Sequence, residues 1–201
     1  MKLSNLFFLL ATILLGMKPT SAHSMNNPTL PTELTCSALL AKSQLPLGAL
    51  PYNEITTDSF QPALESAFRE CYQRLDLLRE ESATPTFTNT IEAIEAIDLP
   101  LEQAWLVFEN YTSLNADPKL DELSQTFTPE RKRLSNAIFM DSHLFSRVSA
   151  IYDQRDSLGL NTEQTALLVR TYTEFLRNGA KLSDSEKKRV AEIDERLAFL
   201  G

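Results

Sequence analysis

Apolar residues recur every three or four positions along most of residues 57–200, and this spacing constrains the fold more than any other feature of the chain. It places the apolar side chains on one face of a helix, whereas a half-buried strand needs an apolar residue at every second position. Glycine, which many tight β-turns require, accounts for only 5 of the 201 residues. We therefore expect an all-α fold, arranged as an antiparallel helical bundle or an array of helical hairpins.

Capping and turn residues divide this stretch into separate helices. The first begins with Thr57 or Asp58 as its cap, with Asp58 and Gln61 resembling a capping box, and it ends before Pro85. The second starts near Asn89, and we expect it to continue through a kink at Pro100, with two separate helices as the alternative. The remaining boundaries are marked by Asp117-Pro118, Asp141, Leu158-Gly159, Asn161 with Gln164, Asn178-Gly179, and Ser183 with Glu186.

The first 22 residues have the pattern of a secretory signal. Lys2 gives a positive start, an apolar run covers residues 6–17, and small residues occupy positions 20–22. The apolar run is short for a membrane span, although a membrane anchor is the alternative. We expect cleavage after Ala22 and an exported protein, periplasmic or secreted, with no membrane contact once the signal is removed.

The rest of the chain divides into two parts. Residues 23–51 contain four prolines among Asn, Ser and Thr, which indicates a linker or an extended arm. Residues 52–201 form the helical domain.

The net charge of the chain excludes one class of binding partner, and its cysteine content allows at most one disulfide within the chain. With 19 basic and 27 acidic residues the formal charge is −8, which excludes nucleic acid as a partner because phosphate binding needs clustered Lys and Arg. The two cysteines are Cys36 and Cys71. In an oxidising compartment they form a disulfide or, alternatively, remain as one buried and one free thiol.

Several segments of residues 48–201, taken in order, resemble one family. Residues 50–55 (Leu-Pro-Tyr-Asn-Glu-Ile) and 60–64 (Phe-Gln-Pro-Ala-Leu) resemble the start of the mature region in peptidyl-dipeptidases and oligopeptidase A. Residues 85–91 (Pro-Thr-Phe-Thr-Asn-Thr-Ile) are similar to a Pro-Thr-Phe-Glu-Asn-Thr-Ile segment of that family, with Thr88 in place of the usual Glu. Further similar segments are 144–148, 152–160 and 175–188.

The chain thus resembles the N-terminal part of a zinc metallopeptidase of the thimet oligopeptidase family, which includes oligopeptidase A and the bacterial peptidyl-dipeptidase Dcp. The resemblance implies a large helical enzyme whose N-terminal helices form one wall of a substrate channel and restrict entry to short peptides. It also implies zinc held by an H-E-x-x-H helix and a downstream Glu. This chain has only His23 and His143, which cannot supply the two histidines four residues apart.

We therefore assign no catalytic, cofactor-binding or metal-binding residue in this chain, and we expect zinc only in full-length members of the family. His143 is expected to be a solvated or capping side chain. The carboxylate pairs Glu80-Glu81 and Asp184 with Glu186 are expected on the surface or at a helix cap. The three aromatic residues on apolar stripes are expected in the core, with peptide contact as the alternative: Tyr72, Trp105 and Tyr172.

Two functions remain open at this stage. The first is an inactive, truncated part of such a peptidase, whose missing catalytic region would cover apolar surface left exposed near Leu200. The second is an exported, non-catalytic module that binds short peptides or a separate catalytic chain. An unrelated helical adaptor is disfavoured by the order of the similar segments.

Overall fold

The computed structural model describes residues 39–40 and 43–200, with side chains through residue 197. The expected signal segment and Cys36 lie outside these residues. The helical elements are α2 (Thr57–Arg79), the π-helical η3 (Phe87–Glu92), the short α3 that continues it (Ala93–Glu95), α4 (Leu99–Leu114), α5 (Pro118–Phe139), α6 (Ser142–Asp153), α7 (Thr162–Arg177) and α8 (Asp184–Leu200). Short 3₁₀ turns are η1 (Pro46–Gly48), η2 (Tyr52–Glu54) and η4 (Arg155–Ser157). The described residues contain no strand, so the all-α prediction is confirmed.

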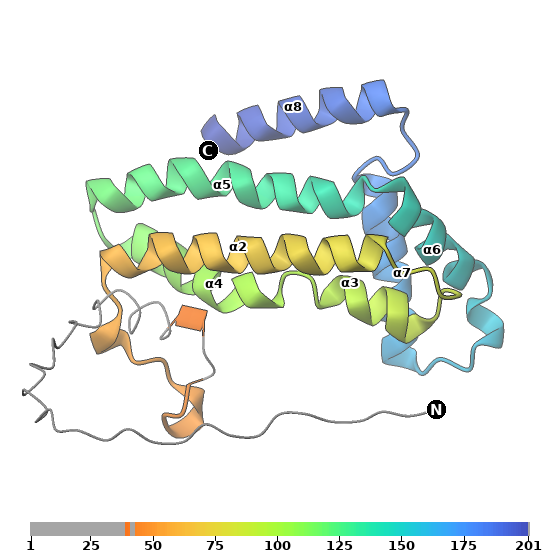
Figure 1. Cartoon of the computed structure of the whole chain (residues 1–201), viewed down its shortest axis with the longest axis horizontal. Helices are drawn as coiled ribbons and strands as arrows, with labels where there is room; N and C mark the ends of the chain where they lie inside the picture. The colour runs from red at the N-terminus through yellow and green to blue at the C-terminus, as the bar shows by residue number, and fades with distance from the viewer. Residues whose placement is uncertain (1–38, 41–42, 201) are drawn as a thin grey trace, which may run out of the picture.

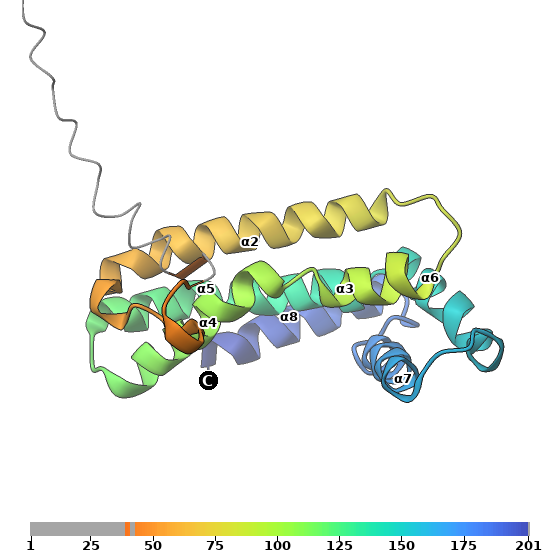
Figure 2. The same cartoon turned by 90° about the horizontal axis from the view of Figure 1, so that it is seen from below.

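The long helices α2, α4, α5 and α8 lie side by side: α2 and α5 run in the same direction, whereas α4 and α8 run in the opposite direction (Figure 1). α2 packs against both α4 and α5, and α4 and α5 also contact each other. α8 lies along the side of α5 that faces away from α2, while α6 and α7 pack together across one end of the array (Figures 1 and 2). None of the helices in the described part of the chain is long and apolar enough to cross a membrane.

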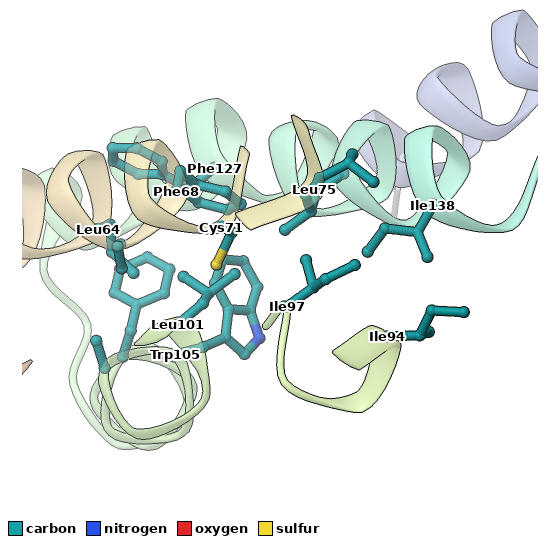
Figure 3. Packing of buried hydrophobic residues seen from close by; sticks show 14 of the residues in the cluster. Leu64, Phe68, Cys71, Leu75, Ile94, Ile97, Leu101, Trp105, Phe127 and Ile138 are labelled. Atoms are coloured by element: carbon teal, nitrogen blue, oxygen red, sulfur yellow. The ribbon is translucent and has the colours of Figure 1, made fainter. Parts of the chain in front are cut away.

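The apolar face of α2 forms the centre of the core (Figure 3). The Phe68 ring stacks on Phe127 of α5, with 5.9 Å between ring centroids, and lies edge-on to Trp105 of α4 at 6.4 Å. Each large apolar side chain buried in this way contributes about 1.5–3 kcal/mol. The buried residues of α2 are Ser59, Phe60, Ala63, Leu64, Ala67, Phe68, Cys71, Leu75 and Leu78.

The start of α2 differs from the prediction by one or two residues. The cap is Thr56, whose backbone N–H donates to Ser59 Oγ at 3.0 Å, so Thr56 and Ser59 form the capping box. The expected cap residue Asp58 lies in the first turn and pairs with Lys119 at the start of α5. Sequence spacing alone did not separate these candidates because Thr56, Thr57 and Asp58 are all good capping residues.

The kink expected at Pro100 is wrong, because the chain forms two separate helices. α3 ends at Glu95, residues 96–98 form a turn, and α4 begins at Leu99 with Pro100 as its second residue. A proline inside a continuous helix lacks an N–H and collides with the carbonyl four residues earlier, whereas the first turn tolerates it. The Arg74 guanidinium donates to the freed carbonyl of Ala96 at 2.7 Å, which stabilises the break.

The other predicted helix starts match the structure closely. The Asp117 side chain accepts from the N–H of Lys119 at 2.9 Å, and the Asp141 side chain accepts from His143 at 2.8 Å. Asn161 and Gln164 form a capping box, and the N–H of Ser183 donates to Glu186 at 2.9 Å. The second helical segment starts two residues earlier than expected, at Phe87, with Thr86 as its cap.

The segment expected to be a linker or arm contributes to the core where the structure describes it. Leu39 is fully buried, and Gln103 Nε2 of α4 donates to its carbonyl oxygen at 2.9 Å. Ile55, after η2, is also buried. This part of the chain therefore packs on the helical domain.

A buried arginine joins α6 to the connection that follows α2. Arg147 Nη1 donates to the carbonyl oxygens of Glu81 at 3.0 Å and Ala83 at 2.9 Å. Its Nη2 lies 3.2 Å from both Asn89 Oδ1 and Thr90 Oγ1 of η3. The residue is only 6% exposed, so these acceptors replace the water that the two Nη atoms have lost, while the buried Nε has no partner.

We expect Arg147→Met to lower the free energy of unfolding by about 3 kcal/mol, because the carbonyls of Glu81 and Ala83 and the buried hydroxyl of Thr90 would lose their donor. Urea denaturation followed by circular dichroism measures this loss. The exposed Arg177→Met variant is the control and should change the free energy by less than about 0.5 kcal/mol. Equal effects of the two substitutions would contradict the role of Arg147.

A second prediction concerns the pH dependence of the Asp141 cap. Partial burial acts to raise the pKa of Asp141, but the N–H groups of Leu144 and His143 and the Arg79 guanidinium outweigh it and hold the pKa below its ordinary value. The carboxylate therefore stabilises the fold above the unfolded pKa of 3.8, and this stabilisation is lost as pH falls through the folded pKa. Asp141→Asn keeps a capping oxygen and should lower the free energy of unfolding by about 1 kcal/mol at pH 7.

Urea midpoints of the wild type and Asp141→Asn, compared from pH 7 down to pH 3, check this expectation. The two midpoints should converge as the wild-type carboxylate becomes protonated. A difference that stays constant over this range would show that the charge of Asp141 is not the cause.

Candidate functional site: a cleft at the break between α3 and α4

A cleft of about 400 Å³ opens where α3 ends and α4 begins. One side comes from the α3–α4 break and the other from the second half of α5. Its floor is apolar and its rim carries charged side chains. The lining residues are Glu95, Asp98, Leu99, Leu101, Glu102, Arg131, Leu134, Ser135, Ile138 and Phe139.

The helix break creates this cleft. Because α3 stops at Glu95 and α4 restarts at Leu99, the backbone turns at residues 96–98 beside α5. The carbonyl of Asp98 accepts from the N–H groups of Leu101 at 2.8 Å and Glu102 at 3.1 Å, so the new helix begins at once. Leu101 points into the core, while Glu102 is exposed at the rim.

The rim is predominantly acidic. Glu95 is paired with Arg170 of α7 at 2.5 Å. Arg131 lies over the Trp105 ring, 4.7 Å from its centroid, and 3.5 Å from Glu109. Partial desolvation raises the pKa of Asp98, and the negative charges of Glu102 and Glu95 raise it further. A bound cation would relieve this repulsion.

The arrangement is suited to binding a ligand. An apolar floor with a carboxylate rim fits a positively charged group that carries an apolar stem. No His or Cys is among the residues that line the cleft. Across the described residues, no group of three His, Cys, Asp or Glu side chains is placed to hold a metal ion.

The polar residues considered from the sequence lie apart from this cleft. His143 is exposed in the first turn of α6, as predicted for a solvated residue. Glu80 is exposed after α2, and Glu81 Oε1 accepts from the N–H of Ala83 at 2.7 Å. Asp184 and Glu186 lie in the exposed first turn of α8, where Glu186 completes the Ser183 cap. His23 lies outside the described residues.

The three aromatic residues pack against the core, as predicted. Trp105 is buried, and its Nε1 donates to Glu109 at 2.6 Å. Tyr172 stacks on Tyr152 with 3.9 Å between ring centroids. Tyr72 donates its hydroxyl to Glu130 at 2.9 Å, and burial together with this hydrogen bond raises the pKa of Tyr72.

The Cys71 thiol is free and fully buried on α2. Burial raises the pKa of Cys71 to about 11, so the thiol stays protonated at neutral pH. Cys71 thus matches the buried thiol of the alternative prediction. Cys36 lies outside the described residues.

Sequence reasoning did not single out the cleft residues Glu95, Asp98, Glu102 and Arg131. In the sequence, these charged residues look like ordinary exposed positions of amphipathic helices. The available signal was Pro100, since a break before it turns the backbone and opens a space beside the neighbouring helix.

Comparison with known proteins shows which proteins this chain is similar to. No family model matches the chain. The chain is 31% identical to dipeptidyl carboxypeptidase of Salmonella typhimurium over 167 residues, which is 83% of this chain and 25% of that protein. It is 28% identical to dipeptidyl carboxypeptidase of Escherichia coli over 166 residues, and 23% identical to oligopeptidase A of Escherichia coli over 163 residues.

The resemblance seen in the sequence segments is thereby confirmed. The chain belongs to the family that contains dipeptidyl carboxypeptidase and oligopeptidase A, and it spans about a quarter of the length of these relatives.

Proposed function

We propose that this chain is an exported, non-catalytic helical part of a peptidase of this family, and that it forms a wall of the channel through which short peptides reach the active site. The observation that carries the proposal is the extent of the match: 83% of the chain aligns with dipeptidyl carboxypeptidase, but only 25% of that enzyme is represented. The rigid array of α2, α4 and α5 suits a wall, because its core is built from large buried side chains.

Zinc chemistry does not fit the residues of this chain. His143 is exposed, and the described residues place no second and third metal ligand around it. The whole sequence contains two histidines, and they are far too distant in sequence to form an H-E-x-x-H pair. We therefore propose that any zinc site of the active enzyme is formed by residues that this chain does not contain.

A second candidate function is peptide binding by the chain itself, and the cleft between α4 and α5 favours it. The unpaired carboxylates of Asp98 and Glu102 stand above an apolar floor that includes Leu134 and Ile138. Such a site would hold a basic side chain of a short peptide, with its aliphatic stem on the floor.

The first proposal predicts that the purified chain does not hydrolyse peptides. A fluorogenic peptide that releases a C-terminal dipeptide should show no cleavage above the rate of buffer, with or without added Zn²⁺. Dipeptidyl carboxypeptidase of Escherichia coli provides the positive control. Zinc-dependent release of a dipeptide by the purified chain would overturn the proposal of a non-catalytic role.

The second candidate predicts selective binding of a basic peptide, measured by calorimetry with acetyl-Leu-Arg-Leu-amide. Its affinity should fall about three- to tenfold in the Asp98→Asn, Glu102→Gln double variant, because two carboxylates are neutralised at the cleft. The Asp121→Asn, Glu122→Gln double variant removes the same charge from exposed positions of α5 and should bind like the wild type. Equal weakening in both variants, or equal binding of acetyl-Leu-Glu-Leu-amide, would exclude the cleft as the site.

A further inference from the structure

The last helix is attached to the molecule differently from the others. Residues 184–197 of α8 include no buried side chain, whereas α2, α4, α5, α6 and α7 each contribute several. The last core residue before α8 is Ala180. α8 nevertheless runs along α5 over much of its length (Figures 1 and 2). Over residues 184–197 its attachment therefore depends on partly buried side chains and on polar contacts.

Charged groups provide these contacts. Lys132 Nζ of α5 lies 3.2 Å from Asp194 Oδ2 of α8. Arg133 Nε lies 3.4 Å from Glu195 Oε1. At the other end of α8, Lys187 Nζ donates to the hydroxyl of Ser142 at 2.6 Å. The side chains of these two ion pairs are 22–47% exposed, so dissolved salt screens them.

The α5 surface beneath α8 contains a buried polar side chain without partners. Asn136 is 7% exposed, and neither its Nδ2 nor its Oδ1 makes a hydrogen bond. Lys132 and Arg133 precede it by one helical turn, so all three lie on one face of α5. Leu134 and Ile138 point to the core on the opposite face, and α8 is the helix that the ion pairs place over Asn136.

A buried amide with no partner destabilises the docked position, because the same amide would be hydrated if α8 moved away. The apolar side of α8 compensates only in part, since Val190 and Ala191 are half-buried but Ile193 is 44% exposed and Leu197 is 61% exposed. Docking thus combines weak, screened attractions with one unfavourable burial.

The segment before α8 can act as the pivot. Gly179 adopts φ +85°, a backbone conformation that favours glycine, and Leu182 Cδ1 lies 2.6 Å from where a β-carbon would be. Lys181, Leu182 and Ser183 are exposed after the last core residue. Rotation within these residues would move α8 without disturbing the packing of α7.

We infer that α8 is a releasable helix, held on α5 by its ion pairs to Lys132 and Arg133, which opens while the rest of the domain stays folded. Release hydrates Asn136 and uncovers the side chains of Lys132 and Arg133, of which Arg133 keeps its ion pair with Glu130 on α5. The inference is independent of the proposed peptidase role, because it concerns only this contact.

Hydrogen exchange of the full chain, measured by mass spectrometry, tests the inference. Amides of residues 184–197 should exchange about three- to tenfold faster in 1 M NaCl than in 0.05 M NaCl, as expected when exposed ion pairs are screened. Amides of α2 and α5 should exchange at the same rate in both. An α8 that exchanges as slowly as α5 and does not respond to salt would overturn the inference.

Three variants separate the ion pairs from general effects of charge. Glu195→Gln removes a partner of Arg133, and Asp194→Asn removes the partner of Lys132, so both should accelerate exchange of α8 in low salt. Glu192→Gln is the matched control, because Glu192 pairs with Arg189 of the same helix. If Glu192→Gln accelerates exchange as much as Glu195→Gln, the cross-helix pairs do not hold α8.

Asn136→Leu acts in the opposite direction. It removes the unpartnered amide and keeps a side chain of similar size, so exchange of α8 should become slower by about threefold or more. Faster exchange in this variant would show that Asn136 supports the docked helix, which contradicts the inference.

Discussion

The packing of one helix, α2, against two others is the contact on which the rest of the structure depends. Its buried face runs from Ser59 to Leu78 and meets α4 on one side and α5 on the other. The aromatic group of Phe68, Trp105 and Phe127 lies at the junction of all three helices. Removing Phe68 would open a cavity between all three, at a cost of about 3–5 kcal/mol.

The remaining elements are placed relative to this centre by polar contacts. Arg147 connects α6 to the chain that leaves α2, and Arg79 at the end of α2 pairs with Asp141 at the start of α6. Both arginines fix the end of the array where α6 and α7 lie. The apolar core thus determines which helices pack together. The arginines Arg147 and Arg79 then attach α6 to the end of α2.

Much of this fold could be predicted from the sequence because its signals are local. The three- and four-residue spacing identified the helices, and side chains such as Asp141 and Asn161 marked their starts, since a cap is made within one turn. The break at residues 96–98 was harder to predict, because a proline either kinks or ends a helix depending on partners elsewhere. Here the partner is Arg74, on a different helix.

The candidate cleft and the α8 contact were beyond sequence analysis for the same reason. Glu102 and Asp194 look alike in the sequence, as exposed acids on amphipathic helices. One stands unpaired above an apolar floor, and the other faces Lys132 across a helix interface. Only the arrangement of α4, α5 and α8 distinguishes a binding rim from an attachment point.

The burial of Leu39 has a consequence for where the folding unit begins. The repeating apolar pattern that announces the helical domain starts some twenty residues later, yet this leucine fills part of the same core and its carbonyl is held by Gln103 of α4. The minimal autonomous domain therefore includes part of the proline-containing arm.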